Sequence, residues 1–517
     1  MALAKYFSKD LLAVNRLINT DQSALEDILK DKIVTLAFDE NALSSFEGFC
    51  GLDIIVRLLA RFYPKIKVID LSETNDKKRT ELIDLAKKIN SNIEIVSEKE
   101  KEDIYIIAGF TEKEIQTTGN KFFFGSDNWI SKYSISKVQT FGVSANPFGC
   151  GMSACIIASN VFRSVFSEHI NYKVIDRELE FSMYSFCIEP KINPQFKDIV
   201  FKDVIIVGIG AIGNGTIWAL SKIDKLNGNL ALVDDEPISR SNLQRYVLFT
   251  EDDETKEKVN VASGFFKQKE LKTTACKGTW MDYIDRRNNW NIDCVAVGID
   301  NEKDRIGVQS SLPRIIFNAF TESELIGITR HLDFENKPCL ACSYIPTFEG
   351  KNRTTEIAEN CKIPDKVNMI KDYYNFNASV NEIIANYSES LLQEISKANK
   401  ISIESLNQYN GKKIDEFYSD FICGGTILTL SETDNEIKYV DAPLAFQSVM
   451  AGILLASELA KYHMNAELKL EDRTDLYHLS PFSELNPYHR SLNKDTTGRC
   501  LCRDEDFLIR YKEKWNK

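Results

Sequence analysis

The sequence predicts an α/β protein with two doubly wound domains in tandem. Strand and helix patterns alternate in the same order twice along the chain, and a glycine-rich turn joins a strand to a helix in the second series only. A polar, helix-prone segment then interrupts the second series. With 517 residues, of which 43% are hydrophobic, the chain is long enough for several domains that each bury a core.

The second series begins with a strand at 203–210 and a helix at 211–223. A strand at 228–236, a helix at 256–269 and a strand at 293–300 follow in turn. Strands and helices that alternate at this length predict a parallel sheet covered by helices. In such a sheet the ligand site lies beyond the carboxyl ends of the strands.

The first series repeats this outline without the glycine turn. Its expected elements alternate in the same way, strand first, at 32–38, 51–62, 65–73, 78–89 and 103–110. The glycines of the segment SSFEGFCGLD, Gly48 and Gly51, do not form the motif of the second series. Apolar helices rich in small residues are expected late in both series, at 146–166 and 441–462. Two copies of one fold, the first degenerate, is the simplest interpretation; two unrelated α/β domains are the alternative.

The glycine turn predicts a phosphate site of the Rossmann-like type. The apolar strand of VIIVGIGAIGNG breaks into Gly208-x-Gly210-x-x-Gly213, and a helix pattern begins there. Glycines allow close approach of the backbone to phosphates, and the N–H groups and dipole of a helix start favour an anion. The motif alone also fits dehydrogenases, flavoproteins and methyltransferases.

Polar residues that suit a nucleoside triphosphate follow the turn. The acidic run Asp234-Asp235-Glu236 lies about 20 residues beyond it, where an acid binds a ribose hydroxyl. The segment SRSNLQRY then supplies Asn242, Gln244 and Arg245, and Lys258 stands near the start of the next helix. Two cations with polar side chains between them would stabilise charge on a leaving pyrophosphate. An NAD-dependent oxidoreductase does not need that set.

The segment 298–301 ends the next strand and contains a candidate magnesium ligand, Asp300. Arg305 follows one turn later. A carboxylate in this place can hold Mg²⁺ between phosphates. The structural alternative is that Asp300 caps a helix and that Arg245 and Lys258 are surface charges.

Two close cysteine pairs predict a zinc site. Cys339-x-x-Cys342 and Cys500-x-Cys502 together offer four thiolates, the commonest tetrahedral zinc set. Unliganded structural thiols are the alternative. The other eight of the 12 cysteines are scattered, as expected of thiols in a reducing compartment.

These patterns divide the chain into four parts. We expect the degenerate copy at 1–195 and the intact copy at 196–356 together with 422–464. A helical insertion is expected at 357–421. The tail 465–517 is expected to complete the zinc site and to end in a docked helix with the sequence DEDFLIRYKEKW.

The charge and the apolar runs narrow the choice of partners and compartment. A net charge of −12 argues against nucleic acid and against anionic membranes as general partners. No run reaches the roughly 18 apolar residues that span a bilayer, and the N-terminus does not resemble a signal peptide. We expect a cytoplasmic protein, and the sequence leaves open whether it forms a homodimer.

The series GxGxxG, VDDE, SNLQR, Lys258 and IDN with Arg305 resembles the ThiF, MoeB and E1 superfamily. Members of this superfamily adenylate the C-terminal glycine carboxylate of ubiquitin-like or sulfur-carrier proteins. The resemblance is detailed over residues 200–345 and extends to the cysteine pairs and the 441–462 helix. Two departures are Tyr246, where many members have glutamine, and the short second cysteine pair.

The resemblance implies a role for each matching residue. The three glycines of the turn would form the phosphate site, and Asp234 would hold the ATP ribose. Asp300 would bind Mg²⁺ and be needed for adenylation. The phosphates would be contacted by polar side chains of the following loop and helix, namely Asn242, Arg245 and Lys258.

A degenerate copy followed by an intact copy resembles eukaryotic-type E1 enzymes and the E1 components of bacterial ubiquitin-like conjugation operons, including antiphage Bil-type systems. The resemblance implies ATP, Mg²⁺ and zinc as cofactors. It also implies a ubiquitin-like protein ending in glycine and an E2-like enzyme as partners. The inactive copy of such enzymes can lend an arginine to the ATP site, for which Arg16 and Arg163 are candidates.

An E1 also needs a cysteine that takes the activated acyl group as a thioester. Cys423, in DFICGGTILTL, follows the helical insertion and is the favoured candidate; Cys361, in AENCKIPDK, is the second. Two other functions stay open on the same residues. One is a ThiF- or microcin-type adenylyltransferase without thioester chemistry, and the other is a peptide-binding module that uses this fold.

Overall fold

The computed structural model describes residues 14, 22–73, 76–96, 103–111, 115, 117, 119–170, 174–287, 289–322, 324–345, 353–418, 421, 443–464 and 475–515. Contacts divide the chain into two compact units. Among the described residues, one unit contains those of 22–345 and 443–515, and the other contains Val14 and those of 353–421. The first unit holds two sheets, and the second is helical.

The first sheet has seven strands in the order β3-β2-β1-β4-β5-β6-β7. The strands from β3 to β5 are parallel, and β6 and β7 continue the sheet in antiparallel pairing. The strands are β1 (Ile33–Phe38), β2 (Lys65–Asp70), β3 (Glu94–Ile95), β4 (Ile104–Ala108), β5 (Asn120–Asp127), β6 (Ile130–Ser134) and β7 (Glu178–Ser182). The helices are α2 (Gln22–Leu29), α3 (Glu40–Ser44), α4 (Phe46–Phe62), α5 (Asp76–Ile89) and α6 (Phe148–Val165).

The second sheet has eight strands in the order β10-β9-β8-β11-β12-β13-β14-β15. Its strands are β8 (Ile199–Val207), β9 (Leu226–Asp234), β10 (Leu271–Lys277), β11 (Cys294–Val297), β12 (Ile315–Thr321), β13 (Ile326–His331), β14 (Leu476–Leu479) and β15 (Tyr488–Arg490). The helices are α7 (Ala211–Lys222), α8 (Lys258–Gly264), α9 (Trp280–Asp285), α10 (Glu302–Ser310), α16 (Ala445–His463) and α17 (Glu505–Trp515).

The two sheets share one topology, which confirms the tandem copies. The first seven strands of the second sheet follow the same order and the same parallel and antiparallel pairing as the whole first sheet. Helices α4, α5 and α6 of the first copy stand at the chain positions of α7, α8 and α16 in the second. The strands expected from the sequence are parallel in both copies, and later strands extend each sheet in antiparallel pairing.

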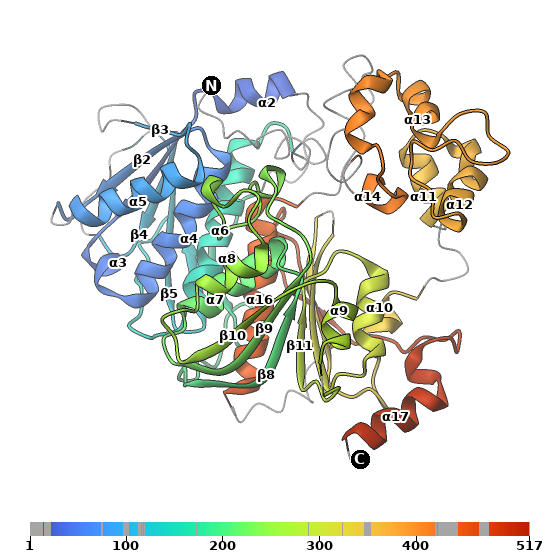
Figure 1. Ribbon diagram of the computed structural model, residues 1–517. Helices are drawn as coiled ribbons and strands as arrows, with labels where there is room; N and C mark the ends of the chain where they lie inside the picture. The colour runs from blue at the N-terminus through green and yellow to red at the C-terminus, as the bar shows by residue number, and fades with distance from the viewer. Residues whose placement is uncertain are drawn as a thin grey trace. The chain divides into compact units, whose positions relative to one another are not determined.

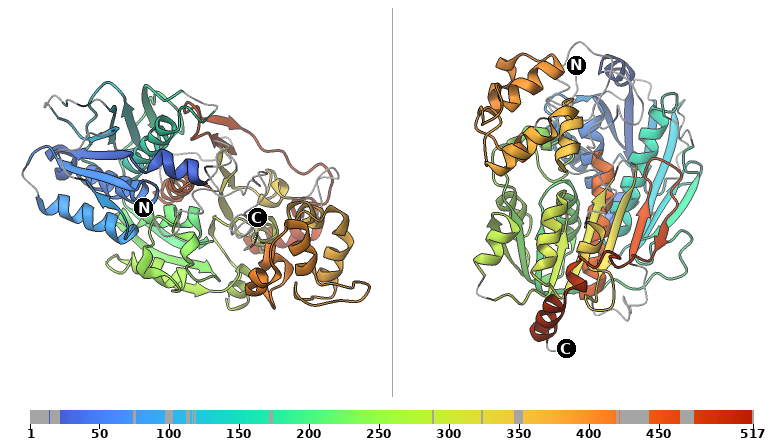
Figure 2. Two further views of the ribbon diagram at one scale, coloured as in Figure 1. Left: turned by 90° about the horizontal axis from the view of Figure 1, so that it is seen from above. Right: turned by 90° about the vertical axis from the view of Figure 1, so that its right-hand side faces the viewer.

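Helices of the two copies pack together between the sheets. α6 contacts both α4 and α16, and α16 in turn contacts α7 and the second sheet (Figures 1 and 2). Small residues allow this close approach: a Cβ at Gly452 of α16 would lie only 2.4 Å from the Ile212 carbonyl oxygen of α7. The late apolar helices predicted from the sequence therefore form the core of the two-copy unit.

The fold explains why one helix of the described residues is long and apolar enough to cross a membrane. That helix is α6, and 89% of its apolar stretch is buried inside the structure. Because α6 is covered by α4, α16 and strands of the first sheet, it must be apolar on most of its surface.

The first copy fills the place of its lost glycine turn with protein. The helix α3 follows β1, with Asp39 capping it by accepting a hydrogen bond from the Ala42 N–H at 3.2 Å. α3 packs so tightly on the start of α4 that a Cβ at Gly48 would lie 2.2 Å from the Ala42 carbonyl oxygen. This is a physical reason for calling the first copy degenerate.

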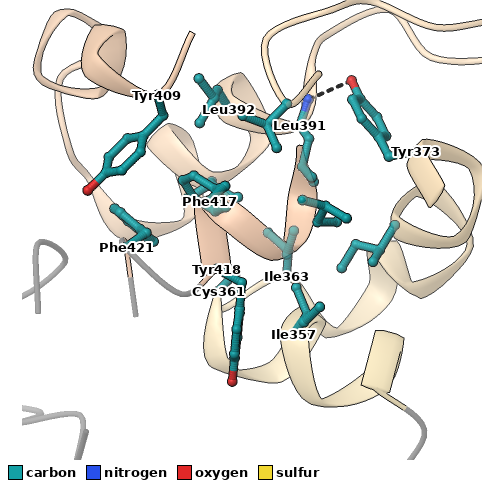
Figure 3. Close-up of a cluster of buried hydrophobic side chains, with 14 of the residues drawn as sticks. Ile357, Cys361, Ile363, Tyr373, Leu391, Leu392, Tyr409, Phe417, Tyr418 and Phe421 are labelled. Carbon is teal, nitrogen blue, oxygen red and sulfur yellow. Dashed lines mark hydrogen bonds between the residues drawn. The ribbon is translucent and has the colours of Figure 1, made fainter. Parts of the chain in front are cut away.

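The helical unit has its own hydrophobic core. Its described helices are α11 (Arg353–Asn360), α12 (Val367–Asn375), α13 (Leu391–Asn399) and α14 (Ile414–Tyr418). Figure 3 shows side chains from these helices and from the loops between them converging on one cluster, where the Tyr373 hydroxyl accepts a hydrogen bond from the Leu391 N–H at 2.8 Å. The helical insertion expected from the sequence is thus present as a compact unit.

Candidate active site

The glycine turn lies at one edge of the second sheet. Val207, at the end of β8, is paired with Val233 of β9 and Val297 of β11, so the residues that follow these three strands meet at that edge. The Gly208 N–H donates to the Val233 carbonyl at 2.9 Å, and the Gly298 N–H donates to the Val207 carbonyl at 2.9 Å. The sheet register therefore brings the turn, the Asp234 region and the Asp300 region together.

The three glycines of the turn differ in what surrounds them. Gly208 has φ 88°, a left-handed conformation that favours glycine. A Cβ at Gly213 would lie 2.2 Å from the Gly208 carbonyl oxygen, whereas a Cβ at Gly210 would meet only the Tyr246 hydroxyl, at 3.6 Å. The fold requires the first and third glycines, and open space at the second leaves room for a ligand.

The first turn of α7 presents backbone N–H groups at this open place. Gly210 is the N-cap of the 12-residue helix, and no side chain among the described residues caps it. The first N–H groups of a helix have no intrahelical partner, and with the helix dipole they favour an anion. The predicted phosphate turn thus has the geometry that phosphate binding requires.

A buried cation stands beside the turn, at the end of β9. The Lys258 ammonium is 2.6 Å from a carboxylate oxygen of Glu236 and 3.3 Å from one of Asp234, and its side chain is only 2% exposed. Burial disfavours its charged form, but Tyr246, Asp234 and Glu236 outweigh burial and raise the pKa of Lys258. Lys258 is therefore a fixed positive charge rather than a surface lysine.

Asp234 joins this cation to the glycine turn. One carboxylate oxygen of Asp234 accepts a hydrogen bond from the Ile209 N–H at 2.7 Å, and the other accepts from the Glu236 N–H at 3.0 Å. Asp234 is mostly buried, whereas the Glu236 side chain is 64% exposed. Of these two acids in the run Asp234-Asp235-Glu236, Glu236 is therefore the more accessible to a ligand.

The aromatic ring of Tyr246 lies close to both predicted cations. Its ring centroid is 5.3 Å from the Lys258 ammonium and 5.7 Å from the Arg245 guanidinium carbon. The side chain is buried, and burial raises the pKa of the hydroxyl. A tyrosine at this departure from the family pattern keeps both cations within reach of an aromatic face.

Two of the predicted loop residues shape the loop itself. The Asn242 side chain accepts a hydrogen bond from the Ser239 N–H at 3.1 Å, which closes the 3-10 turn Arg240–Asn242. Gln244 is fully buried, and its amide donates to the Pro443 carbonyl at 3.0 Å. Arg245, only partly buried, donates to the Gln244 side-chain oxygen at 3.2 Å and is more accessible to a ligand than Gln244.

Asp300 is exposed at the same edge of the sheet. The neighbouring Asn301 caps α10, because its side chain accepts from the Lys303 N–H at 2.8 Å and the Asp304 N–H at 3.3 Å. The capping alternative considered for Asp300 therefore applies to Asn301. Within the part of the chain that the structure describes, the Asp300 carboxylate has no hydrogen bond or ion pair, and exposed carboxylates of this kind suit Mg²⁺.

Arg305 is buried behind the segment that carries Asp300 and forms a hydrogen bond with its backbone. It is 5% exposed, donates to the Ile299 carbonyl at 3.0 Å and to the Asn318 side-chain oxygen at 3.1 Å, and stacks on Tyr344. These contacts leave Arg305 directed at the protein rather than at a ligand. Arg305 therefore fixes the position of the turn that follows β11, and this structural role explains why it belongs to the motif.

The four predicted metal cysteines form one cluster. Their sulfur atoms lie within 4.8 Å of one another, and the separations include 3.9 Å for Cys339–Cys342 and 3.4 Å for Cys342–Cys502. Tetrahedral zinc with Zn–S bonds of about 2.3 Å places sulfur atoms about 3.8 Å apart, so the donor set fits zinc. The cluster packs against α17, whose Tyr511 hydroxyl donates to the Arg314 carbonyl at 3.3 Å, as expected of a docked helix.

The two candidate thioester cysteines have different outcomes. Cys423 lies outside the described residues. Cys361 directly follows α11 and is fully buried in the core of the helical unit, beside Ile357 and Tyr418 in Figure 3. A thiol in this apolar place has the environment of a structural cysteine.

Of the two arginine candidates of the first copy, only Arg163 lies among the described residues. Arg16 lies outside the described residues. Arg163 is 1% exposed and forms an ion pair with Asp176, and it also donates to the Asn160 side-chain oxygen at 2.9 Å. Arg163 therefore holds the end of α6 within the first copy.

One family model covers the active-site half of the chain. The ThiF family matches residues 184–495, which include the glycine turn, the residues around Lys258 and part of the cysteine cluster. A second model, Prokaryotic E2 family C, matches residues 37–167, which lie in the first copy.

The chain is similar to a known protein in sequence and to several solved structures in fold. The uncharacterized protein y4jF of Sinorhizobium fredii is 33% identical over 518 residues, which cover 100% of this chain and 98% of that protein. A structure of E. coli MccB with a form of MccA is 16% identical, with a TM-score of 0.36, over 60% of this chain and 68% of that chain. The Microcin C7 biosynthetic enzyme MccB with N-formylated MccA is 18% identical, with a TM-score of 0.36 and the same coverage. Because the ThiF model matches more than half of the chain, the protein belongs to the ThiF family.

Proposed function

We propose that this protein is an E1-like activating enzyme. It uses ATP and Mg²⁺ to adenylate the C-terminal glycine of a ubiquitin-like protein, with release of pyrophosphate. A cysteine of the enzyme then takes the acyl group as a thioester for transfer to an E2-like enzyme. The observation that supports adenylation best is the buried Lys258 cation beside an open, uncapped glycine turn. The matching models of the ThiF family and of Prokaryotic E2 family C are consistent with this reaction.

The residues at the sheet edge divide the work of the first step. The N–H groups at the start of α7 bind phosphate oxygens, and Lys258 and Arg245 offset the charge that grows on pyrophosphate as it leaves. Asp234 holds Lys258 against the turn, and Glu236 beside it binds the ribose. Asp300 would hold Mg²⁺, which when bound neutralises phosphate charge. The substrate carboxylate oxygen attacks the α-phosphorus of ATP, forming the acyl adenylate as the bond to pyrophosphate breaks.

For the second step we propose Cys423 as the nucleophile. The sulfur of its thiolate attacks the acyl carbon, AMP leaves, and the acyl group becomes a thioester. The burial of Cys361 in the helical core supports this choice between the two sequence candidates. The same burial also favours a second candidate function, an adenylyltransferase without thioester chemistry, because it leaves one of the two candidate thiols inaccessible. We place either activity in the cytoplasm, where thiols stay reduced.

ATP–pyrophosphate exchange tests the first step. The enzyme is mixed with ATP, Mg²⁺ and labelled pyrophosphate, with and without ubiquitin-like proteins that are encoded near its gene and end in glycine. We expect exchange that requires one such protein and is lost when its terminal glycine is deleted. Absence of exchange with every such protein would overturn the proposal. Cys423→Ala should leave exchange intact, since the thioester forms after pyrophosphate has left.

A further inference from the structure

The loop that carries Gln244 and Arg245 has no regular secondary structure, and its backbone is fixed by side chains from another part of the protein. Between the 3-10 turn at Arg240–Asn242 and the one at Glu251–Asp253, residues 243–249 belong to no helix or strand. Most of these residues are buried, so their backbone carbonyl oxygens need hydrogen-bond donors from elsewhere in the protein.

Arg61 of the first copy supplies most of these donors. Its guanidinium donates to the Leu243 carbonyl at 3.0 Å, the Tyr246 carbonyl at 2.8 Å, the Val247 carbonyl at 3.1 Å and the Phe249 carbonyl at 2.7 Å. The Arg61 side chain, on α4, is 1% exposed. Four carbonyl groups spread over seven residues of the chain are thus gathered around one planar group. Arginine is the side chain with five N–H donors in a fixed plane, so this is an arrangement that lysine cannot reproduce.

Arg57, one turn earlier on α4, extends the same contact. It donates to the Val247 carbonyl at 3.1 Å, and its own position is fixed by Asp53, which accepts at 3.0 Å. Asp53 also accepts a hydrogen bond at 2.8 Å from the indole of Trp218, on α7 of the second copy. One face of α4 therefore holds both the loop and the helix that follows the glycine turn.

Asn214 links the loop to the glycine turn within the second copy. It is fully buried, and its amide donates to the Ile209 and Gly210 carbonyls, each at 3.0 Å. Its side-chain oxygen accepts from the Leu248 N–H at 3.2 Å. A shift of the loop backbone would therefore be transmitted to the turn.

We propose that Arg61 is a positioning residue for the ATP site: the copy that has lost its own nucleotide turn fixes the loop that serves the other copy. The inference rests on the proposed function, because it assigns ATP to the second copy. Without Arg61 the loop would have to be ordered when ATP binds, and the entropy cost of that ordering would weaken binding. The first copy is thus a part of the ATP site without contacting the nucleotide.

The test compares Arg61→Met with a matched change at the same interface. Lys461 of α16 is also a buried cation, and it donates across the two copies to the Met183 carbonyl at 3.0 Å and the Tyr184 carbonyl at 3.2 Å. Lys461→Met therefore removes a comparable contact between the copies without touching the loop. Arg61→Lys keeps the charge but supplies fewer donors in a different geometry. Full-length variants are compared by hydrogen exchange of peptides covering 243–249 and by calorimetric titration with ATP and Mg²⁺.

We expect Arg61→Met to speed loop exchange and to weaken ATP binding at least about tenfold, with Arg61→Lys in between. Lys461→Met should lower the melting temperature and leave both other readouts unchanged. Unchanged loop exchange in Arg61→Met, or faster exchange with unchanged ATP affinity, would overturn the inference. If the wild-type chain bound no ATP, the proposed function would fail instead, and loop exchange would still decide whether Arg61 holds the loop. Arg57→Met, which removes fewer contacts, gives the same comparison if Arg61→Met does not fold.

Discussion

Replacing Lys258 with methionine tests the proposed adenylation site with little change in the shape of the side chain. Methionine keeps an unbranched side chain of similar length, with sulfur in place of one methylene, and removes the ammonium group. In the wild type that group is 2.6 Å from Glu236 and 3.3 Å from Asp234. Because these neighbours raise the pKa of Lys258 despite its burial, the substitution removes a full positive charge at every pH at which activity would be assayed.

We expect Lys258→Met to have a moderate effect on stability and a large effect on the rate of adenylation. Removing one partner of a buried ion pair typically costs about 3–5 kcal/mol. Here Glu236 is 64% exposed and returns to water, and Asp234 keeps hydrogen bonds from two backbone N–H groups. We therefore expect a smaller loss of unfolding free energy, about 1–3 kcal/mol. A donor that stabilises developing charge in a transition state is worth about 100- to 1,000-fold in rate.

The assay is partner-dependent ATP–pyrophosphate exchange, with Lys256→Met as the control. Lys256 lies two residues away, its side chain is 55% exposed, and its ion pair with Asp253 spans 3.0 Å at the surface. We expect Lys258→Met to slow exchange at least about 100-fold and Lys256→Met to stay within about twofold of wild type. A folded Lys258→Met protein that exchanges pyrophosphate within about tenfold of wild type would refute the role given to the buried cation.

Three further predictions concern the turn, the metal and the pH response. Gly213→Ala forces a Cβ to 2.2 Å from a backbone oxygen, so it should lower the unfolding free energy by more than about 2 kcal/mol. At Gly210 the added Cβ points into open space, so Gly210→Ala should keep the melting temperature of the wild type. Calorimetric titration should show that Gly210→Ala binds ATP more weakly. Similar behaviour of the two variants would contradict the turn geometry. The wild-type chain should contain about one zinc ion by plasma mass spectrometry, and Cys342→Ser should lose it and undock α17; equal zinc in both would exclude the cysteine site. Burial first, and then Lys202, lowers the pKa of His463 from 6.5 to about 4, so the fold favours its neutral form. The unfolded chain therefore gains a proton on this histidine before the folded chain does, and stability present above pH 6.5 is lost as the pH falls toward 4. Urea denaturation measures the loss of unfolding free energy between about pH 7 and pH 5, and His463→Gln should make that loss smaller by about 1–2 kcal/mol. An equal loss in the variant and the wild type would refute this assignment.

Local sequence patterns predicted most of the fold. The sequence correctly placed the alternating strands and helices, the glycine turn and the two late apolar helices. Each of these features has a pattern of apolar residues or glycines that can be seen in consecutive residues. The edge strand β10 was missed because only Leu271 in it is fully buried, so it lacks an apolar pattern. Antiparallel pairing was missed because it depends on where the chain returns: β14 pairs with β13 only after α16 has crossed the sheet.

The candidate site was predictable where its residues belong to recognisable local motifs. The positions of Lys258 beside Asp234 and of the four cysteines follow from register and spacing. The contact of Arg61 with Leu243 spans 182 residues and is made to a backbone carbonyl, which leaves no mark on the residue types at either end. For the same reason the sequence does not distinguish Arg61 from Arg163, whose ion-pair partner Asp176 lies in its own copy.

Intact-mass spectrometry under non-reducing conditions tests the central claim most directly. The enzyme is incubated with ATP, Mg²⁺ and the glycine-terminated ubiquitin-like protein, and both proteins are weighed before and after treatment with a thiol reagent. We predict an enzyme–partner adduct that the thiol reagent releases, that Cys423→Ala abolishes and that Cys361→Ala retains. A partner linked to AMP with no adduct on the enzyme would leave adenylation standing and contradict the thioester, and neither product with any such partner would contradict activation itself.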